Sequence, residues 1–267
     1  MKKNTMPVGI FDSGVGGLSV VKEFMRILPE EDLVYFGDTA RVPYGTKSKS
    51  AIVRFSINNI LFLLKHNVKL IIAACNTVSS VALDTLQGSF KVPVLGVINS
   101  GVQQALRLTK NEKIGVIGTK ATIKSNAYTQ HIKRFSADTQ VYSAECALFV
   151  PLVEQGWLNN AVTKQIVNIY LTPLKKKGID TLILGCTHYP LLKTVIKQEL
   201  GNRVALVDSA KQVALQAKRV LKENNLLNKG KAKATLSCYV SDESEAFKSI
   251  ARQFLGFDIG RVVKCDV

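Results

Sequence analysis

Two stretches of the sequence follow the same plan and decide its fold: LIIAACNTVSS at residues 70–80 and LILGCTHYPLL at residues 182–192. Each begins with an apolar run of strand length, passes through a small residue to a cysteine and small polar residues, and continues with a helical pattern. In parallel sheets, ligands bind where a strand ends and the next helix begins. The echo therefore predicts two similar lobes, each with a chemically active strand end.

The alternation of short apolar runs and helical segments continues along the whole chain. Strands are expected at residues 8–11, 33–36, 69–74, 93–97, 113–117, 140–143, 181–184, 204–207, 234–240 and 261–264. Helices are expected at residues 17–28, 50–65, 78–86, 102–108, 125–135, 148–154, 161–176, 191–200, 211–223 and 243–255. Apolar strands that alternate with helices indicate parallel sheets covered on both faces. We predict an α/β protein of two similar lobes, each with a mostly parallel sheet flanked by helices, and an active site in the cleft between them.

A second, looser echo helps to divide the chain. VGIFDSGVGG at residues 8–17 resembles IGVIGTKAT at residues 114–122. Together the two echoes place the boundary near residues 98–100. The first lobe would comprise residues 1–98 and 208–267, because the last strands and helices are expected to fold back on it. The second lobe would comprise residues 99–207.

Composition narrows the class of protein. The chain has 267 residues, 46% hydrophobic and 21% charged, as in globular rather than disordered proteins. Its five cysteines contain no pair at zinc-site spacing and are too sparse for a disulfide framework. The start, MKKNTMPVGIFDSG, lacks the apolar stretch of a secretory signal, and no apolar run is long enough to span a membrane. We expect a cytoplasmic protein with reduced thiols and no membrane contact.

Reactive and polar residues follow four of the expected strands. They are Asp12-Ser13-Gly14, Cys75-Asn76-Thr77, Gly118-Thr119 and Gly185-Cys186-Thr187-His188. Helix N-termini at these strand ends point N–H groups toward a ligand. We therefore expect the four segments to gather around one binding site.

The glycine-rich segment DSGVGG at residues 12–17 permits a tight turn and close backbone approach to a ligand. It is not a dinucleotide-binding fingerprint, because position 19 is serine, and no Gly-Lys-Ser/Thr of a phosphate-binding loop follows. Asp12 would repel a phosphate. The segment is either an ordinary strand-to-helix turn or a cradle for a small carboxylate.

A lone cysteine at the end of an apolar strand is usually a small buried hydrophobic residue. Cys75 and Cys186, however, occupy matching places in two similar lobes. A helix N-terminus lowers a thiol pKa from ~8.5 toward ~3.5–7.5. We expect each thiol to act as a base near neutral pH, with Asp12 and His188 each tuning or relaying a proton for one of them.

Two further segments are candidates for the site. The loop GDTARVPYGTK at residues 37–47 carries a turn signal at Pro43-Tyr44-Gly45, and Tyr44 either lines a pocket or sits in a solvent turn. Glu154, in FVPLVEQGW, either faces the same cleft or is solvated on a helix.

Four motifs, FDSGVGGLSV, GDTARVPYG, ACNTVS and LGCTHYPLL, occur in this order and spacing. The chain in this respect resembles the glutamate racemases of the cofactor-independent aspartate/glutamate racemase superfamily. The resemblance runs from about Val8 to Val207-Asp208-Ser209, with no departure at a motif position. The charge of +16 is not something that the family pattern accounts for.

The resemblance implies interconversion of L- and D-glutamate, which supplies D-glutamate for peptidoglycan, with neither pyridoxal phosphate nor a metal. It implies that Cys75 and Cys186 are the two bases on opposite faces of the substrate α-carbon. Asp12 would assist Cys75, and His188 would assist Cys186. The substrate would be held by Asp12, Ser13, Tyr44, Gly45, Asn76, Thr77, Thr187 and His188, with Thr119 as a further candidate.

Several alternatives stay open on the sequence alone. The nearest is a cofactor-independent racemase or isomerase of another small acid such as aspartate. A redox protein could pair the two cysteines, although no C-x-x-C occurs. The charge of +16 suggests a nucleic-acid binder, but the basic residues are spread along the chain without a zinc-finger or RRM signature. We expect a small-molecule substrate and no specific nucleic acid, and a homodimer is an open option.

Overall fold

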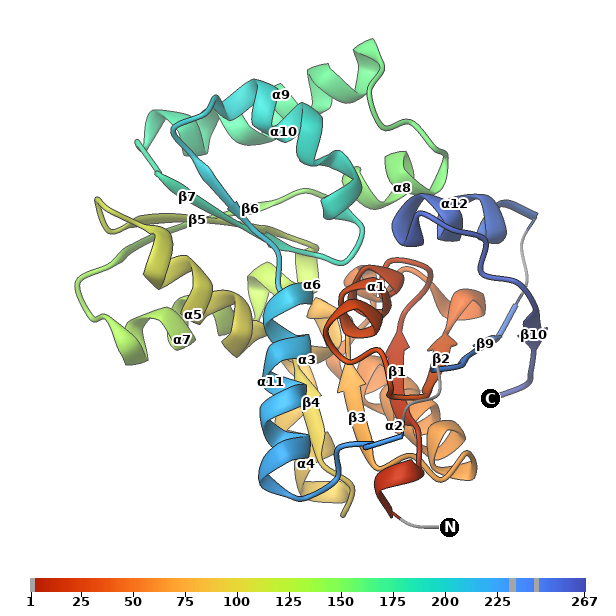
Figure 1. Cartoon of the computed structure of the whole chain (residues 1–267). Coiled ribbons are helices and arrows are strands. Elements are labelled where there is room, and N and C mark those ends of the chain that lie inside the picture. The colour runs from red at the N-terminus through yellow and green to blue at the C-terminus, as the bar shows by residue number, and fades with distance from the viewer. Residues whose placement is uncertain (1–2, 231–233, 243–244) are drawn as a thin grey trace.

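Two sheets, each with parallel pairing between all neighbouring strands, organise the described residues 3–230, 234–242 and 245–267 of this computed structural model (Figure 1). The first sheet has the strand order β10 (Val262–Lys264), β9 (Leu236–Val240), β2 (Leu33–Gly37), β1 (Val8–Asp12), β3 (Leu70–Ala73) and β4 (Val94–Gly96). The second has the order β6 (Gln140–Glu145), β5 (Lys113–Gly118), β7 (Thr181–Gly185) and β8 (Ala205–Val207). The α/β fold class with parallel sheets flanked by helices is therefore confirmed.

The strand register explains why reactive residues meet. In the first sheet Phe11 pairs with Ala73, so Asp12 and Cys75 leave the sheet at the same edge. In the second sheet Gly118 pairs with Gly185, so the segments that begin with Thr119 and Cys186 also leave together.

Helices cover both sheets. Along the first sheet and the returning C-terminal part of the chain lie α1 (Leu18–Ile27), α2 (Lys49–Lys65), α3 (Asn76–Val81), α4 (Leu83–Ser89), α11 (Ala210–Glu223) and α12 (Glu245–Leu255). With the second sheet are α5 (Ile98–Leu108), α6 (Lys120–Lys124), α7 (Ala127–Phe135), α8 (Phe149–Glu154), α9 (Ala161–Lys176) and α10 (Lys193–Leu200). In Figure 1, α9 and α10 cover one face of this sheet, and α5 and α7 cover the other. Single-turn 3-10 helices occur at Lys3–Thr5, Thr39–Arg41, Tyr44–Thr46 and Tyr189–Leu192.

One apolar cluster connects the two sheets beneath the site. It runs from Ile10 of β1 through Phe149 of α8 to Leu184 of β7, all of which are buried. The strand ends are thus held on a continuous core. Nowhere in the described part of the chain does a helix have the length and apolarity needed to cross a membrane.

Three expected helices differ from the structure. The one predicted over residues 78–86 is two helices, because Ala82 leaves the helical region (φ −122°, ψ −16°) between α3 and α4. The one predicted from residue 102 already begins at Ile98. The one predicted from residue 191 begins as a 3-10 turn, and α10 starts at Lys193. The short helix α6, which Thr119 caps, was not expected.

The predicted division of the chain stays a prediction. The expected boundary at residues 98–100 falls within the first turn of α5. Strands β9 and β10, from the C-terminal part of the chain, extend the first sheet beyond β2.

Candidate active site

The segments that follow β1, β3, β5 and β7 meet around one small cavity. Its lining consists of Ser13, Val42, Pro43, Tyr44, Gly45, Cys75, Asn76, Thr77, Thr119, Val150, Cys186, Thr187 and His188. Both thiols therefore face the same space from different sheets. The cavity has a volume of about 10 Å³, roughly that of one water molecule. The cleft is closed in this structure.

Cys75 lies between the end of β3 and the first residue of α3, and only 5% of its surface is exposed. Its Sγ donates to Ser13 Oγ over 3.7 Å. Burial and the negative charge of Asp12 raise the Cys75 pKa to about 12. The expectation of a lowered thiol pKa is therefore wrong for Cys75, because desolvation outweighs the N-terminus of a six-residue helix. In the closed cleft Cys75 is a neutral thiol.

Asp12 is fully buried at the end of β1, where it organises the glycine-rich turn. Its Oδ2 accepts hydrogen bonds from the backbone N–H groups of Gly14 and Gly17, at 3.2 and 3.0 Å. Burial raises its pKa above the usual value, although the nearby His188 and these backbone bonds oppose the rise. Thr187 from the second sheet donates to Oδ1 over 3.3 Å. Asp12 acts on Cys75 through its charge, while its hydrogen bonds go to the turn and to Thr187.

His188 connects the second thiol to a carboxylate. Its Nδ1 lies 3.9 Å from Cys186 Sγ, and its Nε2 donates to Glu154 Oε1 over 3.2 Å. Burial lowers the His188 pKa, but the hydrogen bonds to Cys186 and Glu154 prevail and raise it to about 10. The imidazole is therefore protonated at neutral pH beside Cys186. Glu154 contacts His188, but it is not among the residues that line the cavity and its side chain is 30% exposed, so its role stays a prediction.

The loop residue Tyr44 is buried and faces the cavity, so it does not occupy a solvent turn. Its hydroxyl donates to the fully buried carboxylate of Asp38 and accepts from Asn59 Nδ2 over 3.1 Å. Arg41 Nε binds Asp38 at 2.7 Å, and Ser241 Oγ donates to it over 2.9 Å. A charged and hydrogen-bonded network thus anchors the loop beneath the cavity.

Polar contacts join the two sheets at the site itself. Thr77 Oγ1 lies 2.9 Å from Thr119 Oγ1 and 3.3 Å from Thr122 Oγ1. The glycine-rich turn also touches the turn after β7: a β-carbon on Gly16 would lie 2.5 Å from Thr187 Oγ1 and 2.8 Å from His188 Nδ1. Only glycine permits this close approach.

Sequence reasoning missed several residues that build the site. Val42 and Val150 line the cavity, but an apolar residue in a loop or helix carries no signal of its own. Asp38 directly follows β2, and Asp12 is the last residue of β1, so the position of Asp38 at a strand end was the available signal. Tyr128 of α7 donates to Asn76 Oδ1 over 2.5 Å, and nothing in the sequence points to that contact.

The arrangement suits proton transfer to a small acid. Two thiols from different sheets share one small cavity, each with its own acid–base neighbour, among hydroxyl and amide groups that can bind a carboxylate. Throughout the described residues, no cluster of three or more His, Cys, Asp or Glu side chains could hold a metal ion.

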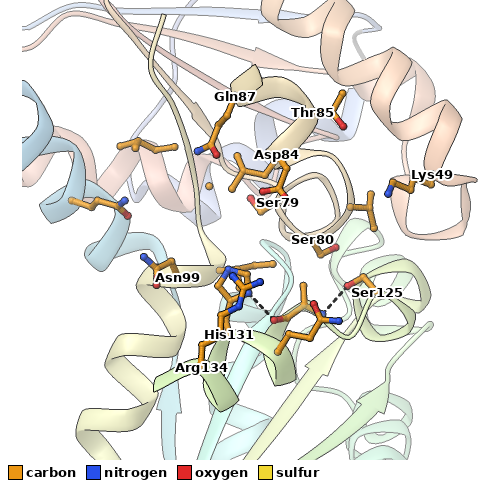
Figure 2. Close-up of a pocket in the computed structure, with 18 of the residues that line it drawn as sticks. Lys49, Ser79, Ser80, Asp84, Thr85, Gln87, Asn99, Ser125, His131 and Arg134 are labelled. Atoms are coloured by element: carbon orange, nitrogen blue, oxygen red, sulfur yellow. Dashed lines mark hydrogen bonds between the residues drawn. The ribbon is translucent and has the colours of Figure 1, made fainter. Parts of the chain in front are cut away.

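A larger hollow of about 590 Å³ lies between α3–α4 and α7. Figure 2 shows Asp84 and Ser80 on one side of it and His131 and Arg134 on the other. Its described lining contains none of the residues that the sequence singled out for chemistry. Size alone therefore does not identify the reactive site.

Comparison with known proteins gives consistent matches. Residues 16–217 match the Asp/Glu/Hydantoin racemase family. The chain is 46% identical over 255 residues to a glutamate racemase of Geobacter metallireducens, covering 96% of this chain and 94% of that protein. It is 51% identical over 251 residues to a glutamate racemase of Neisseria meningitidis serogroup A, covering 94% and 93%. The crystal structure of glutamate racemase from Francisella tularensis in complex with D-glutamate matches the fold with a TM-score of 0.92 and 40% identity, over 98% of each chain.

Proposed function

The chain belongs to the Asp/Glu/hydantoin racemase family, as its motifs led us to expect, and we propose that it interconverts L- and D-glutamate with Cys75 and Cys186 as the two proton-transfer groups. The observation that carries this proposal is that the two thiols reach one closed cavity from different sheets. Each thiol also has a separate titratable neighbour, Asp12 for Cys75 and His188 for Cys186.

The proposed reaction balances with protons alone. The thiolate of one cysteine removes the α-proton from one face of glutamate, and the thiol of the other delivers a proton to the opposite face. The raised pKa of Cys75 keeps it protonated as a donor. His188, protonated beside Cys186, stabilises negative charge on that sulfur. After one turnover the protonation states of the two thiols are exchanged, ready for the reverse direction or for re-equilibration through Asp12 and His188.

The substrate-binding groups follow from the cavity lining. We assign carboxylate and ammonium recognition to the lining residues Ser13, Tyr44, Gly45, Asn76, Thr77, Thr187 and His188, with Thr119 beside them. Asp12 is not part of the lining, and we assign it a role through Thr187, from which it accepts a hydrogen bond. Glutamate is many times larger than the 10 Å³ cavity, so the lobes must separate to admit it and close again around it. Closure excludes water and strengthens the interactions that stabilise the developing carbanion.

The wider role is part of the proposal. D-Glutamate made by this reaction would supply peptidoglycan synthesis. The mechanism needs both thiols reduced, which favours the cytoplasm as the working compartment. No step requires pyridoxal phosphate or a metal, so treatment with a chelator should leave the rate unchanged. A homodimer stays a prediction, to be tested by sedimentation.

The decisive test is a circular-dichroism assay with each enantiomer of glutamate, and with aspartate as the matched control substrate. We expect glutamate to racemise in both directions. Cys75→Ala and Cys186→Ala should each lower kcat at least ~10²–10⁴-fold, as expected for loss of a general acid or base. In D₂O the product should carry deuterium at Cα. Product that keeps only protium there would refute the two-thiol mechanism, and preference for aspartate would refute the substrate.

A further inference from the structure

We propose that Tyr128 is a positioning residue that joins the two thiol-bearing turns: its hydroxyl orients Asn76, next to Cys75, while its ring packs against Gly185, next to Cys186. This inference rests on the function proposed above. It gives a helix of the second lobe a direct part in arranging substrate-binding groups of the first lobe.

The hydroxyl contact is short and shielded from solvent. Tyr128 is 3% exposed and Asn76 is 5% exposed. The Tyr128 hydroxyl donates to Asn76 Oδ1 over 2.5 Å. Because this bond holds Oδ1 toward Tyr128, we infer that Asn76 presents its amide N–H groups to the cavity that it lines. Tyr128 therefore makes Asn76 a hydrogen-bond donor toward a bound carboxylate.

The ring of Tyr128 meets the other turn. A β-carbon on Gly185, the last residue of β7, would lie 3.2 Å from Tyr128 Cε2. This distance is tighter than most side-chain contacts, so the ring lies close against the backbone that leads directly into Cys186. One side chain of α7 thus touches the neighbour of each thiol and spans the boundary between the sheets.

The surroundings keep the Tyr128 hydroxyl protonated, which is the form that donates a hydrogen bond to Asn76. Burial raises its pKa, the negative form of Cys186 raises it further, and the hydroxyl of Ser209 opposes the rise. The phenol therefore stays neutral across the working pH range.

The positioning role differs from that of an ordinary core residue. A core tyrosine would affect stability without changing how tightly substrate binds. A residue that orients Asn76 would affect binding of both enantiomers, because Asn76 would lose its orientation and keep a buried, unsatisfied oxygen. The KM therefore separates the two roles.

The test is Tyr128→Phe, which removes the hydroxyl and keeps the ring. We expect KM to rise about 10-fold for both L- and D-glutamate, from the loss of one buried hydrogen bond, with kcat within about 3-fold of the wild type. The matched control is Tyr142→Phe, whose hydroxyl binds Gln140 on strand β6, away from the cavity. Its kinetic constants should equal those of the wild type. Equal KM values for the two variants would overturn the proposal.

A double-mutant cycle shows whether Tyr128 acts through Asn76. In an Asn76→Ala background, Tyr128→Phe should raise KM by less than about 2-fold, because the partner is already gone. Additive effects would overturn the proposal.

The two proposals fail in different ways. If the wild type does not interconvert the enantiomers of glutamate, the proposed function is wrong. If the wild type is active and Tyr128→Phe behaves like Tyr142→Phe, only the positioning role of Tyr128 is wrong.

Discussion

At His188 two opposing effects meet, since burial lowers its pKa while its bonds to Cys186 and Glu154 raise it to about 10. Glu154→Gln keeps the hydrogen-bonding shape but removes the negative charge, so it should lower the His188 pKa by about 1 unit or more. We expect the alkaline limb of the kcat/KM profile to lie near pH 10 in the wild type and to move to lower pH in the variant. The control Glu199→Gln alters an exposed pair with Lys175 and should leave the profile in place. If the alkaline limb of the kcat/KM profile does not move in Glu154→Gln, Glu154 has no role in keeping His188 protonated.

The raised pKa of His188 also predicts how the stability of the fold depends on pH. The folded pKa of about 10 lies above the ordinary value of 6.5, so the protonated imidazole stabilises the fold. This contribution is fully present below pH 6.5 and is lost as the pH rises to about 10. The Tm difference between wild type and Glu154→Gln should therefore be largest in neutral or mildly acidic solution and shrink toward pH 10. A difference that grows with pH would show that His188 is neutral in the fold.

Individual residues differ in how far sequence could predict them. Cys75 and Cys186 were predictable as a pair because each follows a strand at a matching place in the sequence pattern. The pKa of Cys75 was not predictable, because it depends on burial and on the charge of Asp12 from a neighbouring strand. Tyr128 belongs to the same class, since its contact with Asn76 joins residues from different sheets. These roles arise from tertiary packing, which local pattern does not encode.

Among the elements, the glycine-rich turn between β1 and α1 tests whether its close approach to the turn after β7 matters for activity. Gly16→Ala would place a methyl group 2.5 Å from Thr187 Oγ1 and 2.8 Å from His188 Nδ1. The turns must then separate, and a displacement of this kind can cost on the order of 10²-fold in rate. We expect kcat/KM to fall ~10- to 100-fold, measured by the racemisation assay.

A matched glycine offers the control. A β-carbon added to Gly88 of α4 would have no neighbouring atom within 4 Å, so alanine fits there. Because alanine favours helices over glycine, Gly88→Ala should stabilise the protein by up to about 1 kcal/mol without changing activity. Equal activity of the Gly16→Ala and Gly88→Ala variants would mean that the turns after β1 and β7 accommodate the added methyl group without disturbing the site.

Helices and strands were predictable where the hydrophobic pattern extends over several residues. Apolar runs located the strands to within about two residues, because buried parallel strands are nearly continuous in hydrophobicity. The helix break at Ala82 involves no glycine or proline that would have predicted it, and α6 is only five residues long. The break leaves α3 to follow Cys75 and α4 to pack on β4. Short helices and breaks of this kind depend on what they pack against.

On the scale of the whole molecule, a buried ion pair at the edge opposite the active site ties distant parts of the chain together. Lys69 Nζ lies 2.5 Å from Glu31 Oε2, and both side chains are at most 2% exposed. The ammonium also donates to the carbonyl of Asn4 over 2.6 Å, and the backbone N–H of Asn228 donates to Glu31 over 2.7 Å. The pair thus joins the N-terminal turn, the starts of β2 and β3, and the segment after α11.

Breaking this pair from one side should be costly. Lys69→Met leaves the Glu31 charge buried without its cation, so the free energy of unfolding should fall by about 3–5 kcal/mol. Glu31→Gln combined with Lys69→Met removes both charges and should recover most of that loss. Glu23→Gln, which alters the exposed pair with Arg26, should change stability by less than about 1 kcal/mol. Urea unfolding measures the free energy of unfolding of all three variants.

Because the pair lies at the amino ends of the strands and the thiols at their carboxyl ends, kcat of the folded variants should match the wild type. A double variant no more stable than Lys69→Met would mean that the pair itself, and not the isolated charge, controls the stability of this edge.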